Sequence, residues 1–190
     1  SVLRAYHLLC VALMAALIFS TASCVSGGDN PDSEQEESHA ASNANWDAQW
    51  QQKELDMLEW VNFYRAQSNV CGDVERPAVP PLEMNDVVQI AARLHSEDMG
   101  VQNYFSHDGL DGRDPFQRME DVGYAGAFPW GENIQAGSDQ AKDAVASLMT
   151  SPGHCMNITS PEFKVVGFGY AFNPDSDYKH YWTQNFGGSH

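Results

Sequence analysis

The sequence predicts an α+β domain in which helices cover an antiparallel sheet. Apolar side chains recur every three or four residues through most of the chain, as in amphipathic helices, and they change to alternation in the C-terminal quarter, as in strands. The 190 residues are enough for one folded domain, and 43% of them are hydrophobic, which supports a packed core.

Residues 1–24 have the layout of an export signal. Arg4 precedes an uninterrupted apolar run from Leu8 to Phe19, and small residues follow this run up to Cys24. A run of this length is too short to cross a bilayer core of about 30 Å at about 1.5 Å per residue. We therefore expect the segment to direct export and to be removed.

Two cleavage sites are compatible with this signal. Thr21, Ala22, Ser23 and Cys24 resemble a bacterial lipobox, in which the cysteine is acylated and becomes the new N-terminus. Acylation of Cys24 would attach the protein peripherally to a membrane surface through a lipid anchor. Ordinary cleavage after Ala22 is the alternative, because Ser20 and Ala22 satisfy the small-x-small requirement, and it would release a secreted protein.

An acidic, flexible linker is predicted over residues 25–45, which contain Gly, Ser, Asn and acidic residues but no Lys or Arg. Such a segment cannot bury enough apolar area to offset its chain entropy, so the folded domain is expected over residues 46–190. The whole chain has 10 basic and 26 acidic residues, for a formal net charge of −16. This balance argues against binding to a phosphate backbone and excludes nucleic acid as an expected partner.

Helices are predicted at four places in the folded part. The first spans residues 47–68 with Asp47 as its N-cap, the second spans residues 85–102, and the third main helix spans residues 139–149 and ends before Pro152-Gly153. A short helix is expected over residues 115–122. The second helix carries two neighbouring apolar stripes, so we expect both of its faces to be largely buried, with His95 as a core histidine.

Loops and strands account for the remaining segments. The Pro-rich residues 71–81 and the Gly- and Asp-rich residues 106–114 are predicted as loops. Alternating side chains predict strands over residues 164–172 and 178–186, separated by the turn-forming residues 173–177.

Cys71 and Cys155 are the two cysteines that remain once the signal is set aside. An oxidising compartment would favour a disulfide between them. The chain-entropy model assigns about 4–5 kcal/mol of stabilisation to a loop as long as the one this bond would close. Two unpaired, buried thiols are the alternative.

Short motifs follow one another through nearly all of the folded part, from Leu55 to Gly187. They include Val61-Asn62 with Arg65, His95-Ser96-Glu97-Asp98-Met99, Phe105-Ser106-His107, Asp111-Gly112-Arg113, Gly131-Glu132-Asn133-Ile134, Ser151-Pro152-Gly153-His154, Asn157-Ile158 and Tyr181-Trp182-Thr183-Gln184-Asn185-Phe186-Gly187. Their types and order resemble bacterial members of the CAP superfamily, which includes cysteine-rich secretory proteins, insect venom antigen 5 and plant pathogenesis-related proteins. The resemblance implies an α-β-α sandwich in which helices pack on an antiparallel sheet.

The resemblance also implies a cleft histidine at His107 and a cleft glutamate at Glu132. Bacterial members carry a Ser-Pro-Gly-His turn where eukaryotic CAP proteins have a second glutamate. Here that turn puts Ser151 at about the position of the glutamate, and it makes His154 a further candidate for the cleft.

Imidazoles and a carboxylate that converge in a cleft have two chemical uses. His107 and His154 would suit Zn²⁺ or another divalent cation, with open positions for water. The same groups would serve as a general acid and base, because histidine titrates near neutral pH. Structural roles are the alternative: Glu132 can accept backbone amide bonds, and His154 can cap a helix end.

The functional prediction is an extracytoplasmic protein, either a cell-envelope lipoprotein or a secreted one. Its CAP-type cleft is expected to bind a small ligand, a divalent metal or an envelope component. A metal-assisted hydrolase acting on peptide or cell-envelope polymer is one alternative, and a structural or adhesive surface domain is another. The resemblance implies no settled reaction, because a fold does not fix a function.

Overall fold

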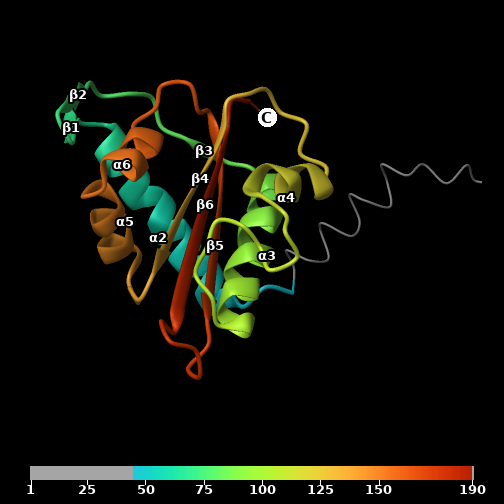
Figure 1. Ribbon diagram of the computed structural model, residues 1–190. Coiled ribbons are helices and arrows are strands. Elements are labelled where there is room, and N and C mark those ends of the chain that lie inside the picture. The colour runs from blue at the N-terminus through green and yellow to red at the C-terminus, as the bar shows by residue number, and fades with distance from the viewer. Residues whose placement is uncertain (1–44, 190) are drawn as a thin grey trace, which may run out of the picture.

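The structure is a computed structural model that describes residues 45–189 (Figure 1). The predicted export signal, Cys24 and nearly all of the predicted linker lie outside the described residues. No helix among the described residues has both the length and the apolar character needed to cross a membrane.

A four-stranded sheet forms the middle of the molecule, with the strand order β3-β5-β6-β4. β5 (Val165–Phe172) and β6 (His180–Gly187) form the predicted antiparallel hairpin. β4 (Trp130–Ala136) pairs antiparallel with β6 and lies at one edge of the sheet, although the sequence did not predict this strand. The short strand β3 (Glu83–Met84) pairs parallel with β5, so the sheet is mixed.

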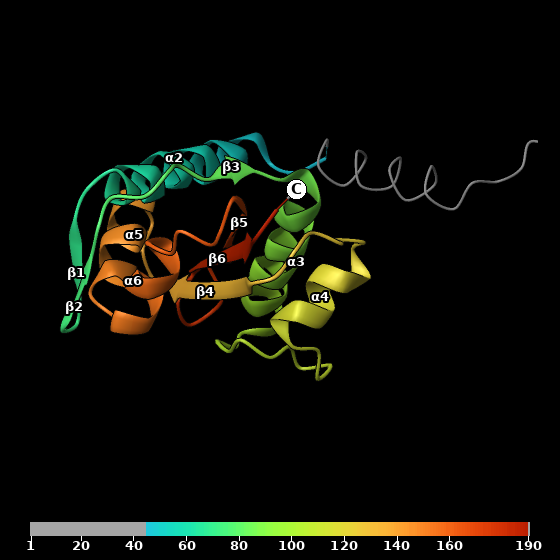
Figure 2. The same cartoon turned by 90° about the horizontal axis from the view of Figure 1, so that it is seen from above.

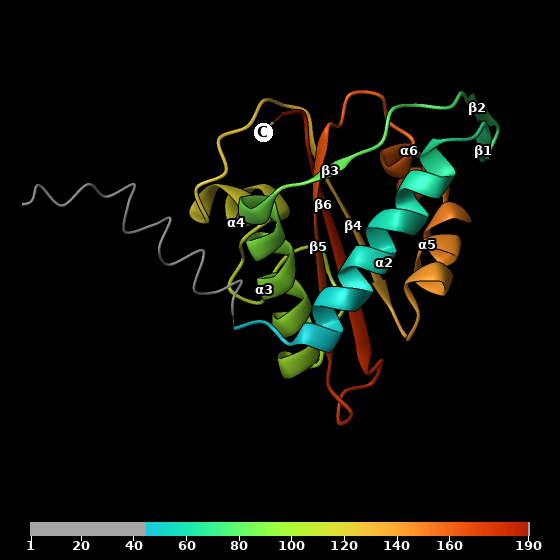
Figure 3. The same ribbon diagram turned by 180° about the vertical axis from the view of Figure 1, so that it is seen from behind.

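Helices cover both faces of this sheet, as the predicted α-β-α sandwich requires (Figure 2). α3 (Asp86–Gln102) and α4 (Pro115–Asp121) pack on one face. α2 (Ala48–Arg65), α5 (Ala141–Met149) and α6 (Pro152–Ile158) pack on the other. Figure 3 shows α2 crossing the sheet, with α3 to one side of it and α5 to the other.

Polar caps set the starts of three helices. Asp47 accepts hydrogen bonds from two backbone N–H groups at the start of α2, as predicted, and Asn85 does the same for α3. Asp114 and Gln117 form a reciprocal capping box at the start of α4. α6 was not predicted, because Pro152 was interpreted as a stop, whereas a helix tolerates proline in its first turn.

Buried apolar side chains form three clusters among the described residues, and the two largest are cores that hold the layers together. The larger core lies between the sheet and the helices α2, α5 and α6, and it includes Met57, Val61, Leu148, Phe168 and Trp182. The smaller core lies between the sheet and the α3–α4 pair, and it consists of Val88, Ala91, Met119, Tyr124 and Val165.

The outer face of α3 corrects one prediction. Leu94 and Val101 are 50% and 68% exposed, so the stripe that contains them is buried only in its first half, where Ala91 is 0% exposed. His95, on the neighbouring stripe, is only 1% exposed and lies in the interior as expected.

A small hairpin occupies the region predicted to begin the Pro-rich loop. Its strands are β1 (Asn69–Cys71) and β2 (Val74–Arg76), and it lies beside α6 (Figure 1). A disulfide joins Cys71 in β1 to Cys155 in α6, with a Cα–Cα distance of 5.5 Å. The predicted pairing is therefore confirmed, and the alternative of two free thiols is wrong.

Candidate functional site

A hydrogen bond between His107 and Glu132 forms the centre of the candidate site. Glu132 is buried in the edge strand β4, and His107 lies half exposed on the loop that follows α3. The Nδ1 atom of His107 is 2.8 Å from Oε1 of Glu132. Since a carboxylate accepts, Nδ1 donates, and this fixes the tautomer that leaves the Nε2 lone pair of a neutral His107 available to a ligand.

Arg118 donates a hydrogen bond to the second oxygen of the same carboxylate. Its Nη2 atom donates to Oε2 of Glu132 at 2.8 Å and to the backbone oxygen of His107, also at 2.8 Å. Both oxygens of Glu132 are therefore engaged within the protein. The carboxylate acts as an orienting group that fixes the ring of His107, an arrangement that also occurs behind metal-bound histidines.

Arg118 was not predicted from the sequence as a site residue. Its position could have indicated burial, because Arg118 precedes the apolar Met119 on a short helix with a clear N-cap. An arginine on the inner face of a helix requires an acidic partner, because burial of an unpaired charge is costly.

The loop that carries His107 is fixed at several points. Nε2 of His95 lies 3.0 Å from the backbone oxygen of Ser106, directly before His107. Gly112 adopts a φ of +85°, a left-handed conformation that glycine adopts without strain. Arg113 pairs with Asp111 at 2.6 Å and with an acidic residue of α4 at 2.9 Å. His107 is therefore displayed from an ordered loop.

A network of buried amides attaches α6, and with it His154, to the other side of β4. The Nδ2 atom of Asn133 donates to the backbone oxygen of His154 at 3.2 Å and to Oε1 of Gln184 at 3.0 Å. Asn157 donates to Oδ1 of Asn133 at 2.8 Å. His107, from the loop after α3, and His154, from α6, therefore lie against the same edge strand although they belong to opposite helical layers.

A cavity of about 300 Å³ lies beside His154, and we call it the His154 cavity. Its lining includes Phe105, Ile134, Leu148, Ser151 and His154. Phe105 precedes His107 by two residues, so the loop of His107 forms one wall. Ser151 is the N-cap of α6, yet its side chain makes no capping hydrogen bond.

Burial lowers the pKa of His154 below its ordinary value, and the positive charge that His107 can carry lowers this pKa further. The ring of His154 is therefore neutral at neutral pH. The effect of one imidazole on the pKa of the other also means that the two rings lie within electrostatic reach.

The structure thus joins His107 to Glu132 directly, and it places His154 and Ser151 on an adjoining cavity. Across residues 45–189, no three His, Cys, Asp or Glu side chains are grouped so that they could hold a metal ion. Glu132 does not fit as a third metal ligand, since His107 and Arg118 occupy its oxygens. Metal binding by His107 and His154 stays a prediction, and we derive no reaction step through a metal.

Comparisons with known proteins bear on the family and the fold of the chain. Residues 58–186 match the family model described as CAP, cysteine-rich secretory protein family. Over 112 residues the chain is 32% identical to YkwD, an uncharacterised protein of Bacillus subtilis strain 168. This match covers 59% of the chain and only 41% of that relative.

Solved structures show the same fold. An extracellular protein of Bacillus anthracis that contains an SCP domain is 29% identical, with a TM-score of 0.50 over 57% of this chain and 34% of that one. An outer surface protein of Borrelia burgdorferi is 19% identical, with a TM-score of 0.52 over 59% of this chain and 80% of that one. A cysteine-rich secretory protein of Staphylococcus aureus is 14% identical, with a TM-score of 0.53 over 75% and 40%. The last two matches show likeness of fold alone.

Proposed function

Because the chain belongs to the CAP family of cysteine-rich secretory proteins, we propose that it is an extracytoplasmic binding module whose small ligand contacts His107 and fills the His154 cavity. The ligand is mainly apolar and carries at least one hydrogen-bond donor. Phe105, Ile134 and Leu148 supply the apolar walls of the cavity.

One observation carries this proposal: both oxygens of Glu132 are engaged, by His107 and by Arg118. A buried carboxylate in that state orients its partner and has no free oxygen to take a proton from a substrate. It leaves Nε2 of a neutral His107 as an acceptor at the surface, on the loop that forms one wall of the His154 cavity. These are the groups of a ligand site with a few fixed polar contacts.

Hydrolysis is the second candidate, and the same geometry supports it less well. A histidine oriented by a carboxylate serves as a base in hydrolases, but there it acts on a neighbouring nucleophile or water. Among the described residues, no Ser, Thr or Cys side chain is hydrogen-bonded to His107. Ser151, on the adjoining cavity, sits at the start of α6 instead.

Native mass spectrometry of the mature protein, purified from its own organism, tests the binding proposal. We expect a bound small molecule in the wild type, its loss in His107→Ala, and its retention in the exposed control Asp108→Asn.

Zn²⁺ titration of the same three proteins and of His154→Ala tests the metal as ligand. Binding should be lost in His107→Ala and in His154→Ala. A protein that carries and binds nothing, or that cleaves peptides or envelope polymer with His107, would overturn the proposal.

The extracytoplasmic location rests on two further supports. The disulfide between Cys71 and Cys155 is typical of proteins that fold in an oxidising compartment. The similar Bacillus anthracis protein is described as extracellular. We propose that acylation of Cys24 holds this chain at the cell envelope, in reach of an envelope component.

Metabolic labelling with a fatty acid tests the anchor. Label should enter the wild type and the control Cys10→Ala, which removes a cysteine inside the signal, and it should be absent from Cys24→Ala. The Cys24→Ala protein should also appear in the soluble fraction. An unlabelled wild type whose N-terminus begins at Ser23 would instead establish ordinary cleavage after Ala22.

A further inference from the structure

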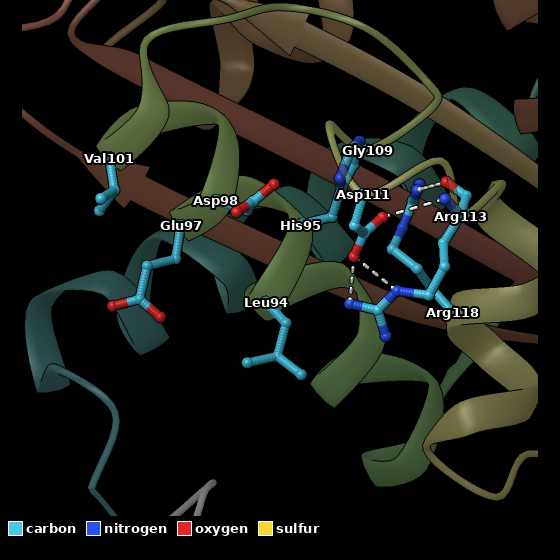
Figure 4. A pocket seen from close by; sticks show the side chains of 9 residues that line it. All are labelled: Leu94, His95, Glu97, Asp98, Val101, Gly109, Asp111, Arg113 and Arg118. Atoms are coloured by element: carbon cyan, nitrogen blue, oxygen red, sulfur yellow. Dashed lines mark hydrogen bonds and ion pairs between the residues drawn. The ribbon is translucent and has the colours of Figure 1, made fainter.

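A second cavity, of about 450 Å³, lies between α3 and the loop of residues 106–114 (Figure 4). We call it the α3 cavity. It shares no lining residue with the His154 cavity. The side chains used below are Leu94, His95, Glu97, Asp98, Val101 and Arg118.

The α3 wall of this cavity carries negative charge that the protein does not neutralise. Glu97 makes no hydrogen bond or ion pair with any of residues 45–189, and Asp98 accepts only from neutral donors, among them the hydroxyl of Tyr104 at 2.5 Å. On the opposite wall, the cations are already matched. Arg113 pairs with two acidic residues, and Arg118 pairs with the buried carboxylate of the candidate site. The cavity therefore favours a positively charged group on its α3 side.

His95 adds an unpaired acceptor at the same place. Its side chain extends from α3 toward the loop at Gly109 (Figure 4), and it is only 1% exposed. The carbonyl of Ser106 can only accept, so Nε2 of His95 carries the proton. Burial lowers the pKa of His95, so the ring is neutral. Its Nδ1 lone pair has no donor among the described residues.

Arg118 adds the complementary donor. The N–H group at its Nε is buried and has no acceptor among residues 45–189. An unpaired buried polar atom destabilises the folded protein, so a ligand that satisfies both atoms relieves two such penalties. Leu94 and Val101 are 50% and 68% exposed at the rim and offer apolar surface beside these groups.

We propose that the α3 cavity binds the α-amino end of an aliphatic amino acid or peptide. The ammonium group lies against Asp98 and donates to Nδ1 of His95, and the exposed charge of Glu97 adds attraction over a longer distance (Figure 4). The adjacent carbonyl or carboxylate oxygen accepts from Nε of Arg118. The aliphatic side chain covers Leu94 and Val101.

Titrations of the mature protein followed by NMR test this assignment. L-leucinamide, which carries an ammonium group beside a carbonyl, should give saturable shifts in the backbone signals of Gly109 and Asp111 and in the ring signal of His95. N-acetyl-L-leucinamide lacks the ammonium group and should bind at least about tenfold more weakly. L-leucine and L-leucylglycine then distinguish a free amino acid from a peptide N-terminus, according to which binds more tightly.

Variants locate the site. Asp98→Asn should weaken binding of L-leucinamide about tenfold, and Glu97→Gln, at an exposed position, about threefold. Glu59→Gln removes the same charge from the exposed face of α2 and should leave the affinity unchanged. His107→Ala should also leave the affinity for L-leucinamide unchanged. The experiment therefore distinguishes a failure of the α3 cavity proposal from a failure of the ligand site proposed at His107. Equal affinity for the two amides, or no saturable shift at millimolar L-leucinamide, would overturn the proposal.

Discussion

Nη2 of Arg118 and Oε2 of Glu132 lie 2.8 Å apart, and both side chains are almost fully buried. This ion pair joins α4 to the edge strand β4 directly beneath His107. The guanidinium also donates to the backbone oxygens of His107 and Arg113, so one side chain fixes a helix, a strand and the loop that connects α3 to α4.

Arg118→Met should lower the free energy of unfolding by about 3–5 kcal/mol, because it leaves the Glu132 charge buried without its cation. Urea denaturation measures the change. The double variant Arg118→Met/Glu132→Gln should recover part of the loss, since no charge is then left unpaired. Arg113→Met removes an exposed arginine with two acidic partners, so it should cost about 1 kcal/mol or less. A single Arg118→Met variant as stable as the wild type would contradict this account.

The pKa of His154 should rise in His107→Ala. Burial keeps this pKa below its ordinary value, but the variant removes the neighbouring positive charge that lowers it further. NMR titration of the ring proton measures the shift, with His180→Ala as a control from the far end of β6. An unchanged pKa in His107→Ala would mean that the two rings do not interact.

Stability should fall as the solution becomes acidic. The folded-state pKa of His154 lies below the unfolded value of about 6.5, so the unfolded chain binds more protons in this range. The contribution to stability is complete above pH ~6.5 and is lost as the pH falls below it. Urea midpoints measured across this range should decrease less steeply in His107→Ala than in the wild type, and an identical slope in the two proteins would refute the coupling.

The disulfide should contribute strongly to stability. It closes a loop with a sequence separation of 84, for which the chain-entropy model gives about 4–5 kcal/mol. The variant Cys71→Ala/Cys155→Ala should lose this amount and become insensitive to reductant, whereas the wild type should lose it only when reduced. Peptide mapping without reductant should recover the two cysteines in one linked fragment, and separate alkylated fragments would contradict the structure.

Arg65 should be a second determinant of stability. It is 1% exposed, and its guanidinium donates to the backbone oxygens of Pro80, Ile158 and Ser160 at 2.8 Å each. Burial without a carboxylate partner lowers the pKa of Arg65 to about 10. Arg65→Met should cost about 3 kcal/mol, because it leaves these oxygens unpaired. Arg65→Lys keeps the charge and should cost less, and thermal unfolding of both variants checks the order.

The sequence predicted the elements whose side chains follow a clear period. The helices at α2, α3, α4 and α5 and the strands β5 and β6 all lie where the pattern indicated. β4 was missed because Asn133 and Gln135 are polar and yet buried in it, so the strand shows no alternation of apolar and polar residues. Their burial depends on partners such as Gln184, which only the folded sheet brings near.

For the candidate site too, some residues were predicted from the sequence and other contacts became visible only in the structure. Motif resemblance indicated His107 and Glu132, and the structure places them in contact. It did not indicate that Arg118 holds the second oxygen, because that contact depends on how α4 packs against β4. The placement of His107 and His154 likewise depends on topology, since the two residues come from opposite layers and both are held beside the edge strand β4.

The amide network beneath His154 has a consequence for production of the protein in eukaryotic secretory cells. Asn157, Ile158 and Thr159 form an acceptor sequence for N-linked glycans. In the folded protein, the nitrogen that would receive the sugar donates to Asn133, and Thr159 is fully buried. A glycan could therefore be added only before α6 docks on β4, and it would then prevent that docking. Thr159→Val would remove the acceptor sequence, but the lost hydroxyl donates to the backbone oxygen of Cys155 and accepts from Arg76, so this variant should secrete without a glycan at a cost in stability.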